Sequence, residues 1–174
     1  MKINRVWEMP NKHTFKIPSI SKFLGKIVYP IGNKIILDPF ANRNHGFATN
    51  YNDINPNNYG SNLDALDFLK RFDSSSVDGV LFDPPYSLRQ LKECYEGMGK
   101  ALTGYDTTSY FHDVKREIER VVKPGGFVVS FCWNSVGIGK NKGFEIQEIL
   151  LISHGGLIND TICTYEINKQ MRLI

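Results

Sequence analysis

The stretch GVLFDPPY, residues 79–86, decides the fold of this 174-residue chain. Its apolar half continues from Asp78 as a short hydrophobic run, which is typical of a β-strand buried on both faces. The two prolines fix φ and lack a backbone N–H, so neither can continue a regular element. We therefore predict a buried strand over 78–82 whose carboxyl end leads directly into Asp83 and the proline pair.

Strands and helices alternate along the rest of the chain. Apolar residues at helical spacing predict two helices, over 63–72 and 110–122. The other predicted strands are 34–37, 47–52, 127–133 and a closing antiparallel hairpin formed by 144–153 and 160–168. This order predicts one α/β domain over 1–174, with an open, mostly parallel sheet that binds ligands at the carboxyl ends of its strands.

Acidic residues follow three of the predicted strands. Asp38, Asp53 and Asp83 each come directly after an apolar run. Because the carboxyl ends of parallel strands meet at one edge of a sheet, we expect these three side chains on one rim.

The tetrad Asp83-Pro84-Pro85-Tyr86 after an apolar strand resembles the catalytic signature of S-adenosylmethionine-dependent methyltransferases that act on the amine of adenine. The resemblance implies that the Asp83 side chain and the Pro84 carbonyl accept the two amino hydrogens. The adjacent Pro85 helps to hold that carbonyl in place, and Tyr86 stacks on the extruded base. No metal and no covalent enzyme intermediate are implied.

Other segments resemble the cofactor-binding motifs of the same family. The run DPFA, residues 38–41, resembles the loop that embraces the methionine part of the cofactor, although Asn42 and Asn44 stand where glycines are usual. Asparagine adopts positive φ more readily than most residues, so the turn can be kept. The cofactor-binding residues that the resemblance implies are Phe15, Ile17, Asp38, Pro39, Phe40, Ala41, Asp53 and Asp64.

The resemblance gives individual roles to Asp53, Asp64, Phe15 and Ile17, and the last three also have a simpler alternative. Asp53 is expected to accept the ribose hydroxyls of the cofactor, as acids do in many nucleoside-binding α/β folds. Asp64 is expected to accept from the adenine amino group, or else to serve as an acid in the first turn of a helix. Phe15 and Ile17 are expected to line the pocket, or else to pack in the core.

The resemblance covers most of the chain, from Asn11 to Ser130. It implies a Rossmann-like, seven-stranded class I methyltransferase sheet, mostly parallel with a C-terminal antiparallel hairpin and with helices on both faces. The implied activity is methyl transfer from S-adenosylmethionine to the N6 amine of adenine in nucleic acid, DNA being favoured over RNA. A net charge of +3 and a pI near 8.7 suit such a polyanionic substrate.

Little of the chain is left for a separate target-recognition domain. We therefore expect relaxed specificity, a very short target site, or recognition supplied by a partner chain or a dimer. Three alternatives stay open: an RNA adenine or guanine amino-methyltransferase, a non-catalytic nucleic-acid-binding module with a degenerate cofactor loop, and a nicotinamide oxidoreductase. The sequence argues against the oxidoreductase, because the Gly-x-Gly-x-x-Gly turn that such enzymes have after their first strand is missing here.

Cysteine usage and hydropathy indicate the compartment. The three cysteines are scattered and match neither a zinc site nor a disulfide framework. No apolar run is long enough to span a bilayer, and the first residues have no apolar signal region. We expect a cytoplasmic protein.

Overall fold

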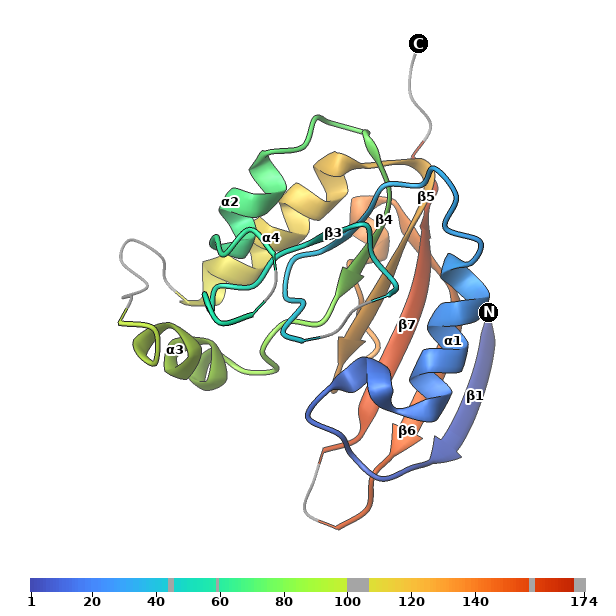
Figure 1. Cartoon of the computed structure of the whole chain (residues 1–174). Helices are drawn as coiled ribbons and strands as arrows, with labels where there is room; N and C mark the ends of the chain where they lie inside the picture. Colours follow the sequence, from blue (N-terminus) through green and yellow to red (C-terminus); the bar gives the residue numbers. More distant parts are fainter. Residues whose placement is uncertain (44–45, 59, 100–106, 157–158, 171–174) are drawn as a thin grey trace.

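The computed structural model describes residues 1–43, 46–58, 60–99, 107–156 and 159–170. The strands in these ranges are β1 (Lys2–Trp7), β2 (Ile36–Asp38), β3 (Asn50–Tyr51), β4 (Val77–Phe82), β5 (Val122–Cys132), β6 (Phe144–Ser153) and β7 (Thr161–Asn168). They form one sheet in the order β1-β6-β7-β5-β4-β2-β3 (Figure 1). Strand β7 runs antiparallel to both β5 and β6, and the other neighbouring strands are parallel. The predicted mostly parallel sheet with a closing hairpin is confirmed.

Helices cover both faces of the sheet, as predicted (Figure 1). They are α1 (Pro18–Val28), α2 (Ala65–Lys70), α3 (Leu88–Glu96) and α4 (Thr107–Val121), with short 3-10 helices η1 (Thr14–Lys16) and η2 (Lys140–Lys142). Successive side chains of a strand point to opposite faces. Val80 and Phe82 of β4 accordingly pack with α2 and α4, while Leu81 packs in a second core with α1.

One strand and two α-helices were not predicted. Strand β1 lies at one edge of the seven-stranded sheet and is mostly exposed. Its sequence therefore shows little of the alternation of apolar and polar residues that marks a half-buried strand. Helix α1 begins with Pro18, which favours the first helical turn, and buries one face of its spiral. Helix α3 is capped by Ser87, whose hydroxyl accepts a hydrogen bond from the backbone N–H of Gln90 at 3.2 Å.

Predicted boundaries differ most where turn residues adjoin a strand. The strand predicted over 47–52 is only Asn50–Tyr51 long, and directly after it the carbonyl of Asn52 accepts from the N–H of Ala41 in the loop that follows β2. Strand β5 begins at Val122 rather than at Phe127, and its register against β4 shifts between these two residues. None of the described helices is both long and apolar enough to cross a membrane.

Candidate active site

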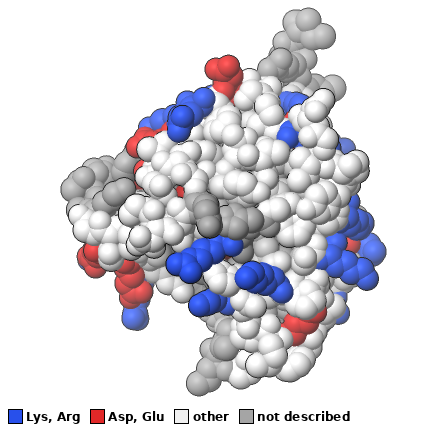
Figure 2. All heavy atoms as spheres, in the orientation of Figure 1, with Lys and Arg blue, Asp and Glu red and all other residues white. Residues whose placement is uncertain are grey.

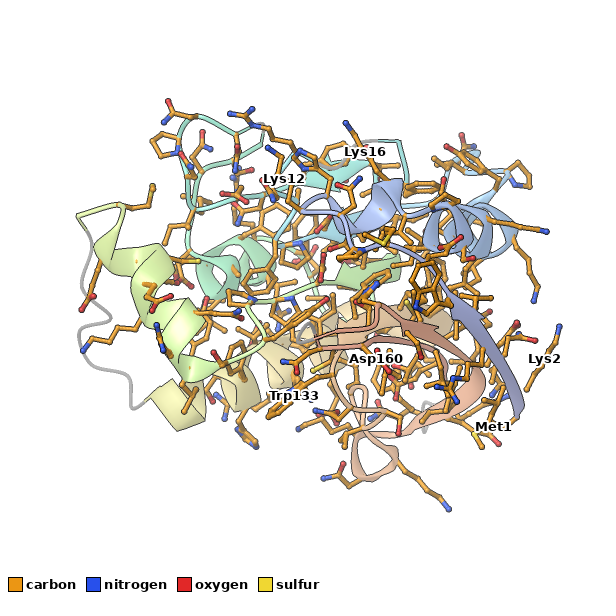
Figure 3. All side chains as sticks on the ribbon, turned by 90° about the horizontal axis from the view of Figure 1, so that it is seen from below. Met1, Lys2, Lys12, Lys16, Trp133 and Asp160 are labelled. Carbon is orange, nitrogen blue, oxygen red and sulfur yellow. The ribbon has the colours of Figure 1, made fainter. Side chains whose placement is uncertain are left out.

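A cavity of about 800 Å³ lies at the edge of the sheet where β2 and β4 end. Figure 3 looks at the molecule from this side. Asp53 and Asp83 line the cavity, and Asp38 is buried beside them at 1 % exposure. Both Asp83 and Asp53 are electrostatic neighbours of Asp38. The prediction that these three carboxyl groups share one rim is confirmed.

The four residues after β4 form one wall of the cavity: Asp83, Pro84, Pro85 and Tyr86 all line it. The backbone N–H of Tyr86 donates to the side-chain oxygen of Gln90 at 2.8 Å, so the first turn of α3 helps to hold this loop.

Asp83 has an unusual protonation equilibrium. Burial raises the pKa of its carboxyl group to about 7, although a hydrogen bond with the Thr14 side chain opposes the shift. A carboxyl group that titrates near neutral pH can both accept hydrogen bonds and exchange a proton under physiological conditions. Thr14 also lines the cavity, and the sequence analysis did not select it. No local sequence pattern shows that η1 lies next to the end of β4 in the folded protein.

The hydroxyl of Tyr86, on a partly buried ring, stays protonated. Burial, and then the neighbouring Asp83, raise the pKa of Tyr86 above its usual value. The side chain of Thr161 opposes this rise in the pKa of Tyr86. The phenol therefore keeps its hydrogen, and Tyr86 is one of the residues that line the cavity.

The segment after β2 lies where the cofactor motif was predicted. Pro39 and Phe40 line the cavity, whereas Ala41 is fully buried behind them. Asn42 has φ of +50°, so the expected left-handed turn is present. Asn44 lies outside the described residues.

Asp38 itself is held at the base of this segment. Its Oδ1 accepts from the backbone N–H of Phe40 at 3.2 Å, while its Oδ2 is buried without a partner among the described residues. Burial, followed by the charge of Asp83, raises the pKa of Asp38 well above its usual value. A buried carboxyl group with a free oxygen favours a cationic or hydrogen-bond-donating ligand nearby.

Asp53 ties two loops together at the cavity. Its Oδ2 accepts from the backbone N–H of Asn42 at 2.8 Å, and its Oδ1 accepts from the N–H of Asn55 at 2.8 Å. Each carboxylate oxygen has a second lone pair, so both can still accept a ligand hydroxyl. Both bonds fix the carboxylate before any ligand arrives.

Asn52 organises the asparagine-rich segment that the sequence showed only as a turn region. Its fully buried amide donates to the carbonyls of Pro39 and Leu63 at 3.1 and 3.0 Å and accepts from the N–H of Leu63 at 3.0 Å. These bonds join the loop after β2 to the start of α2. Composition alone could not single out Asn52 among its neighbours.

Asp64 does not line the cavity. Its side chain caps α2, since Oδ1 accepts from the N–H of Leu66 at 2.7 Å. Its Oδ2 accepts from the hydroxyls of Tyr95 and Tyr110, and both of these tyrosines do line the cavity. The helix-terminus alternative describes its position, and Asp64 reaches the cavity only through the two tyrosines.

Of the two pocket-lining residues expected before α1, only Ile17 lines the cavity. Phe15 is buried in the core instead, where its ring centroid lies 5.0 Å from that of Phe131 and 6.1 Å from that of Phe47. The core alternative therefore describes Phe15.

Basic side chains gather beside the cavity. Burial and then the cations Lys16, Lys12 and Arg43 lower the pKa of His13 below its usual value, which places all three charges around this residue. Lys12 also lines the cavity. Figure 2 shows Lys and Arg atoms clustered below the centre of the face that is drawn in Figure 1, and Figure 3 shows Lys12 and Lys16 close together on one side of the molecule.

Comparison with known proteins identifies the fold. No protein-family model and no curated protein sequence matches this chain. Among solved structures, TrmN from Thermus thermophilus aligns over 87% of this chain with a TM-score of 0.58 and 16% identity, and the chain spans about half (49%) of TrmN. The N-methyltransferase NodS from Bradyrhizobium japonicum aligns over 88% of this chain and 96% of its own, with a TM-score of 0.51 and 9% identity.

A third solved structure matches along almost its whole length. Protein HI0767 from Haemophilus influenzae, provisionally assigned as a methylase, has a TM-score of 0.55 and 14% identity over 88% of this chain and 98% of its own. At such identities the likeness concerns the fold. The chain has the Rossmann-like fold of these methyltransferase structures.

Proposed function

We propose that this protein transfers a methyl group from S-adenosylmethionine to the N6 amine of adenine in DNA. The observation that carries the proposal is the placement of Asp83, Pro84 and Tyr86 together on the wall of one cavity, at the sheet edge where ligands of such folds bind. The likeness of the tetrad to the signature of adenine amino-methyltransferases supports the choice of base, and the shared fold supports the class of reaction.

The residues around the cavity fit this cofactor. S-adenosylmethionine carries a cationic ammonium and a cationic sulfonium group. Asp38 offers a buried carboxyl oxygen without a partner among the described residues, and its electrostatic neighbours Asp83 and Asp53 are also acidic. A cation near this group offsets the repulsion between the three carboxylates. Asp53 is held by two backbone N–H groups and has lone pairs left for the ribose hydroxyls.

When bound, the cofactor supplies an activated methyl group. The residues of the chain act on the adenine amine, because an amine conjugated into an aromatic ring is a poor nucleophile. The Asp83 carboxylate and the Pro84 carbonyl accept the two amino hydrogens and so direct the nitrogen lone pair. As the new N–C bond forms, the nitrogen must lose a proton, and Asp83, with a pKa of about 7, accepts it.

Tyr86 supports the base during this step. Its ring lies directly after the proline pair and lines the cavity. Stacking on an aromatic ring contributes about 1–3 kcal/mol per base, which is comparable to the few kcal/mol needed to extrude a paired base. A duplex substrate is therefore energetically accessible.

The basic cluster formed by Lys12, Lys16 and Arg43 supports a nucleic acid as the carrier of the base. Positive charges beside a cavity attract phosphate groups and fix the position of the strand without reading its sequence. Recognition of a target sequence requires base contacts, for which a partner chain or a second copy is proposed.

Mass spectrometry of nucleosides tests the proposal. DNA and RNA are incubated separately with the protein and S-adenosylmethionine and are then digested. We expect N6-methyldeoxyadenosine from DNA. If methylated nucleosides were found in the RNA sample and not in the DNA sample, the substrate would be RNA instead of DNA. No methylation of either, together with no calorimetric heat at millimolar cofactor, would indicate a non-catalytic binding module.

The rate should depend on pH through Asp83. The raised pKa means that the carboxyl group is protonated below about pH 7 and ionised above it. Because the ionised form accepts the amino hydrogens, we expect kcat/KM to rise about tenfold between pH 6 and pH 8 and then to level off. Stopped-time assays across this range measure the profile.

Asp83→Asn provides the comparison for this profile. The amide does not ionise, so the residual activity of this variant should show no rise near pH 7. A profile of the wild-type protein that is flat from pH 6 to pH 8 would contradict the role of Asp83.

Removal of the basic side chains should weaken nucleic-acid binding in a salt-dependent way. Removing one interaction between a lysine and a phosphate lowers the magnitude of the slope of log K against log salt by about 0.7–0.9. We expect this change for Lys12→Ala and for Lys16→Ala, measured by fluorescence anisotropy with labelled DNA at several salt concentrations. Lys2→Ala is the control, since Lys2 lies on the edge strand β1, away from Lys12 in Figure 3. If Lys12→Ala and Lys16→Ala both had the slope of the wild type, the nucleic-acid strand would not lie against these two lysines.

A further inference from the structure

We propose that the side-chain amide of Gln90 selects the target base by donating a hydrogen bond to a ring nitrogen of adenine beside the amine. The inference rests on the proposed function, in which Asp83 and Pro84 accept the two hydrogens of that amine. Gln90 lines the same cavity as these two residues. It is not among the site residues that the sequence predicted.

The side chain of Gln90 is bonded to the backbone of the tetrad itself. Its Oε1 accepts from the backbone N–H of Tyr86 at 2.8 Å. A backbone N–H only donates, so the oxygen of the amide, and not its NH₂ group, must face Tyr86. The NH₂ group is the other corner of the same planar amide, and it has no partner in the described part of the chain.

Helix capping explains only the oxygen of this side chain. Ser87 caps α3 by accepting from the backbone N–H of Gln90 at 3.2 Å, while Gln90 reaches back to the N–H of Tyr86. This reciprocal pair resembles a capping box, in which glutamate serves as well as glutamine because only an acceptor is needed. The helix dipole even favours a carboxylate at this end. The NH₂ group therefore has no role in the helix and is available to a ligand in the cavity.

The two acceptors of the amine do not by themselves select adenine. Cytosine and guanine also carry an exocyclic NH₂ group, and the Asp83 side chain and the Pro84 carbonyl can accept from any of them. Selection requires a group that contacts a ring atom next to the amine. Gln90 has such a group close to the tetrad, because the same amide is bonded to Tyr86.

A hydrogen-bond donor beside the amine matches adenine better than the other bases. Adenine has an acceptor nitrogen on each side of its amine, N1 on the Watson–Crick edge and N7 on the opposite edge. Cytosine has an acceptor on one side only, and guanine has the N–H donor of N1 beside its amine. The NH₂ group of Gln90 therefore finds an acceptor in adenine whichever edge of the ring faces it.

The entry of a base makes this contact selective. Gln90 is exposed and also lines the cavity, so water satisfies its NH₂ group before a base enters. A base that occupies the cavity displaces this water. A base without an acceptor at this place then leaves the donor unpaired, which costs more than an ordinary hydrogen bond contributes.

Base analogues in which one ring nitrogen is replaced by carbon test the contact. Duplexes carry adenine, 1-deazaadenine or 7-deazaadenine at the position that the wild type methylates, and kcat/KM is measured for each. We expect the wild type to lose about tenfold with one of the two analogues. Gln90→Glu keeps the oxygen that bonds to Tyr86 and removes the donor. Its kcat/KM on adenine should fall about tenfold, and the same analogue should cause no further loss.

Gln147→Glu is the matched control, because it makes the same chemical change on β6 at a residue that does not line the cavity. It should keep the wild-type loss with the analogue. An equal loss with the analogue in Gln90→Glu and in the wild type would overturn the proposal. So would a wild type that methylates both analogues as fast as adenine, and this outcome requires no variant to fold. Gln90→Glu itself should unfold at the wild-type temperature or above, since the helix cap is retained.

Binding measurements separate this inference from the proposed function. Fluorescence anisotropy with the same duplexes, labelled and with the target base opposite an abasic site so that extrusion costs little, measures affinity without methyl transfer. We expect the analogue to weaken binding about fivefold in the wild type and not in Gln90→Glu. Absence of methyl transfer by the wild type would refute the proposed function. The affinities would still decide whether Gln90 contacts the ring nitrogen, and equal affinities of the wild type for all three duplexes would show that it does not.

Discussion

Replacement of Asp83 by alanine is expected to lower kcat/KM for methyl transfer by about 10²–10⁴-fold, the range typical of a positioned acid or base. The alanine side chain can neither accept an amino hydrogen nor take up the proton that leaves the nitrogen. Methyl incorporation into DNA from labelled cofactor measures the loss. Asp67→Ala is the matched control, because this aspartate is largely exposed in α2 and forms an ion pair with Lys70 of the same helix.

Loss of activity in Asp83→Ala should not come from loss of folding. Because burial raises the pKa of Asp83 to about 7, the folded state binds its proton more tightly than the unfolded state does. Its stabilising contribution is therefore present at low pH and is lost as the pH rises through 7. At pH 8 the half-buried and partly desolvated carboxylate destabilises the fold, and Asp83→Ala should unfold at the same temperature as the wild type or higher. If kcat/KM of Asp83→Ala were within a few-fold of the wild-type value, Asp83 would have no role in the mechanism.

Replacement of Tyr86 by alanine is expected to lower kcat/KM by about 10- to 100-fold, since stacking of one base contributes about 1–3 kcal/mol. The loss arises because the extruded base has no aromatic face to occupy in the cavity. Tyr86→Phe is the matched control: it keeps the ring and should retain most of the activity that Tyr86→Ala loses. Steady-state assays of both variants on one adenine-containing duplex measure the difference.

Two outcomes would contradict this role of Tyr86. If Tyr86→Ala were as active as Tyr86→Phe, the ring would not contact the base. If both were inactive with unchanged cofactor binding, the hydroxyl rather than the ring would be the essential group. Cofactor binding by calorimetry separates these cases from damage to the cavity.

Local patterns predicted the frame of the site. The strand before Asp83 and its end at the proline pair follow from apolar residues and from the missing N–H of proline, which act over a few residues. The same reasoning predicted the hairpin of β6 and β7 and the left-handed turn at Asn42. That Asp38, Asp53 and Asp83 meet at one rim followed from their positions after parallel strands.

Local patterns failed where an element is stabilised mainly by distant partners. Strand β1 was not predicted, because it is an edge strand held mainly by its pairing with β6. Phe15 and Asp64 were expected at the cavity from their place in motifs, but one packs in the core and the other caps a helix and binds two tyrosines. A short sequence motif does not show which way a side chain turns.

The sequence by itself determined the class of fold and the end of the strand before the tetrad, because periodicity and turn chemistry depend on neighbours along the chain. Only the tertiary structure decided which side chains surround that tetrad. Thr14 reaches Asp83 from η1, and the imidazole of His154 bonds to Glu8, 146 positions away in the chain. Such contacts depend on the order of strands in the sheet, and that order is set by the packing of the whole chain rather than by any local pattern.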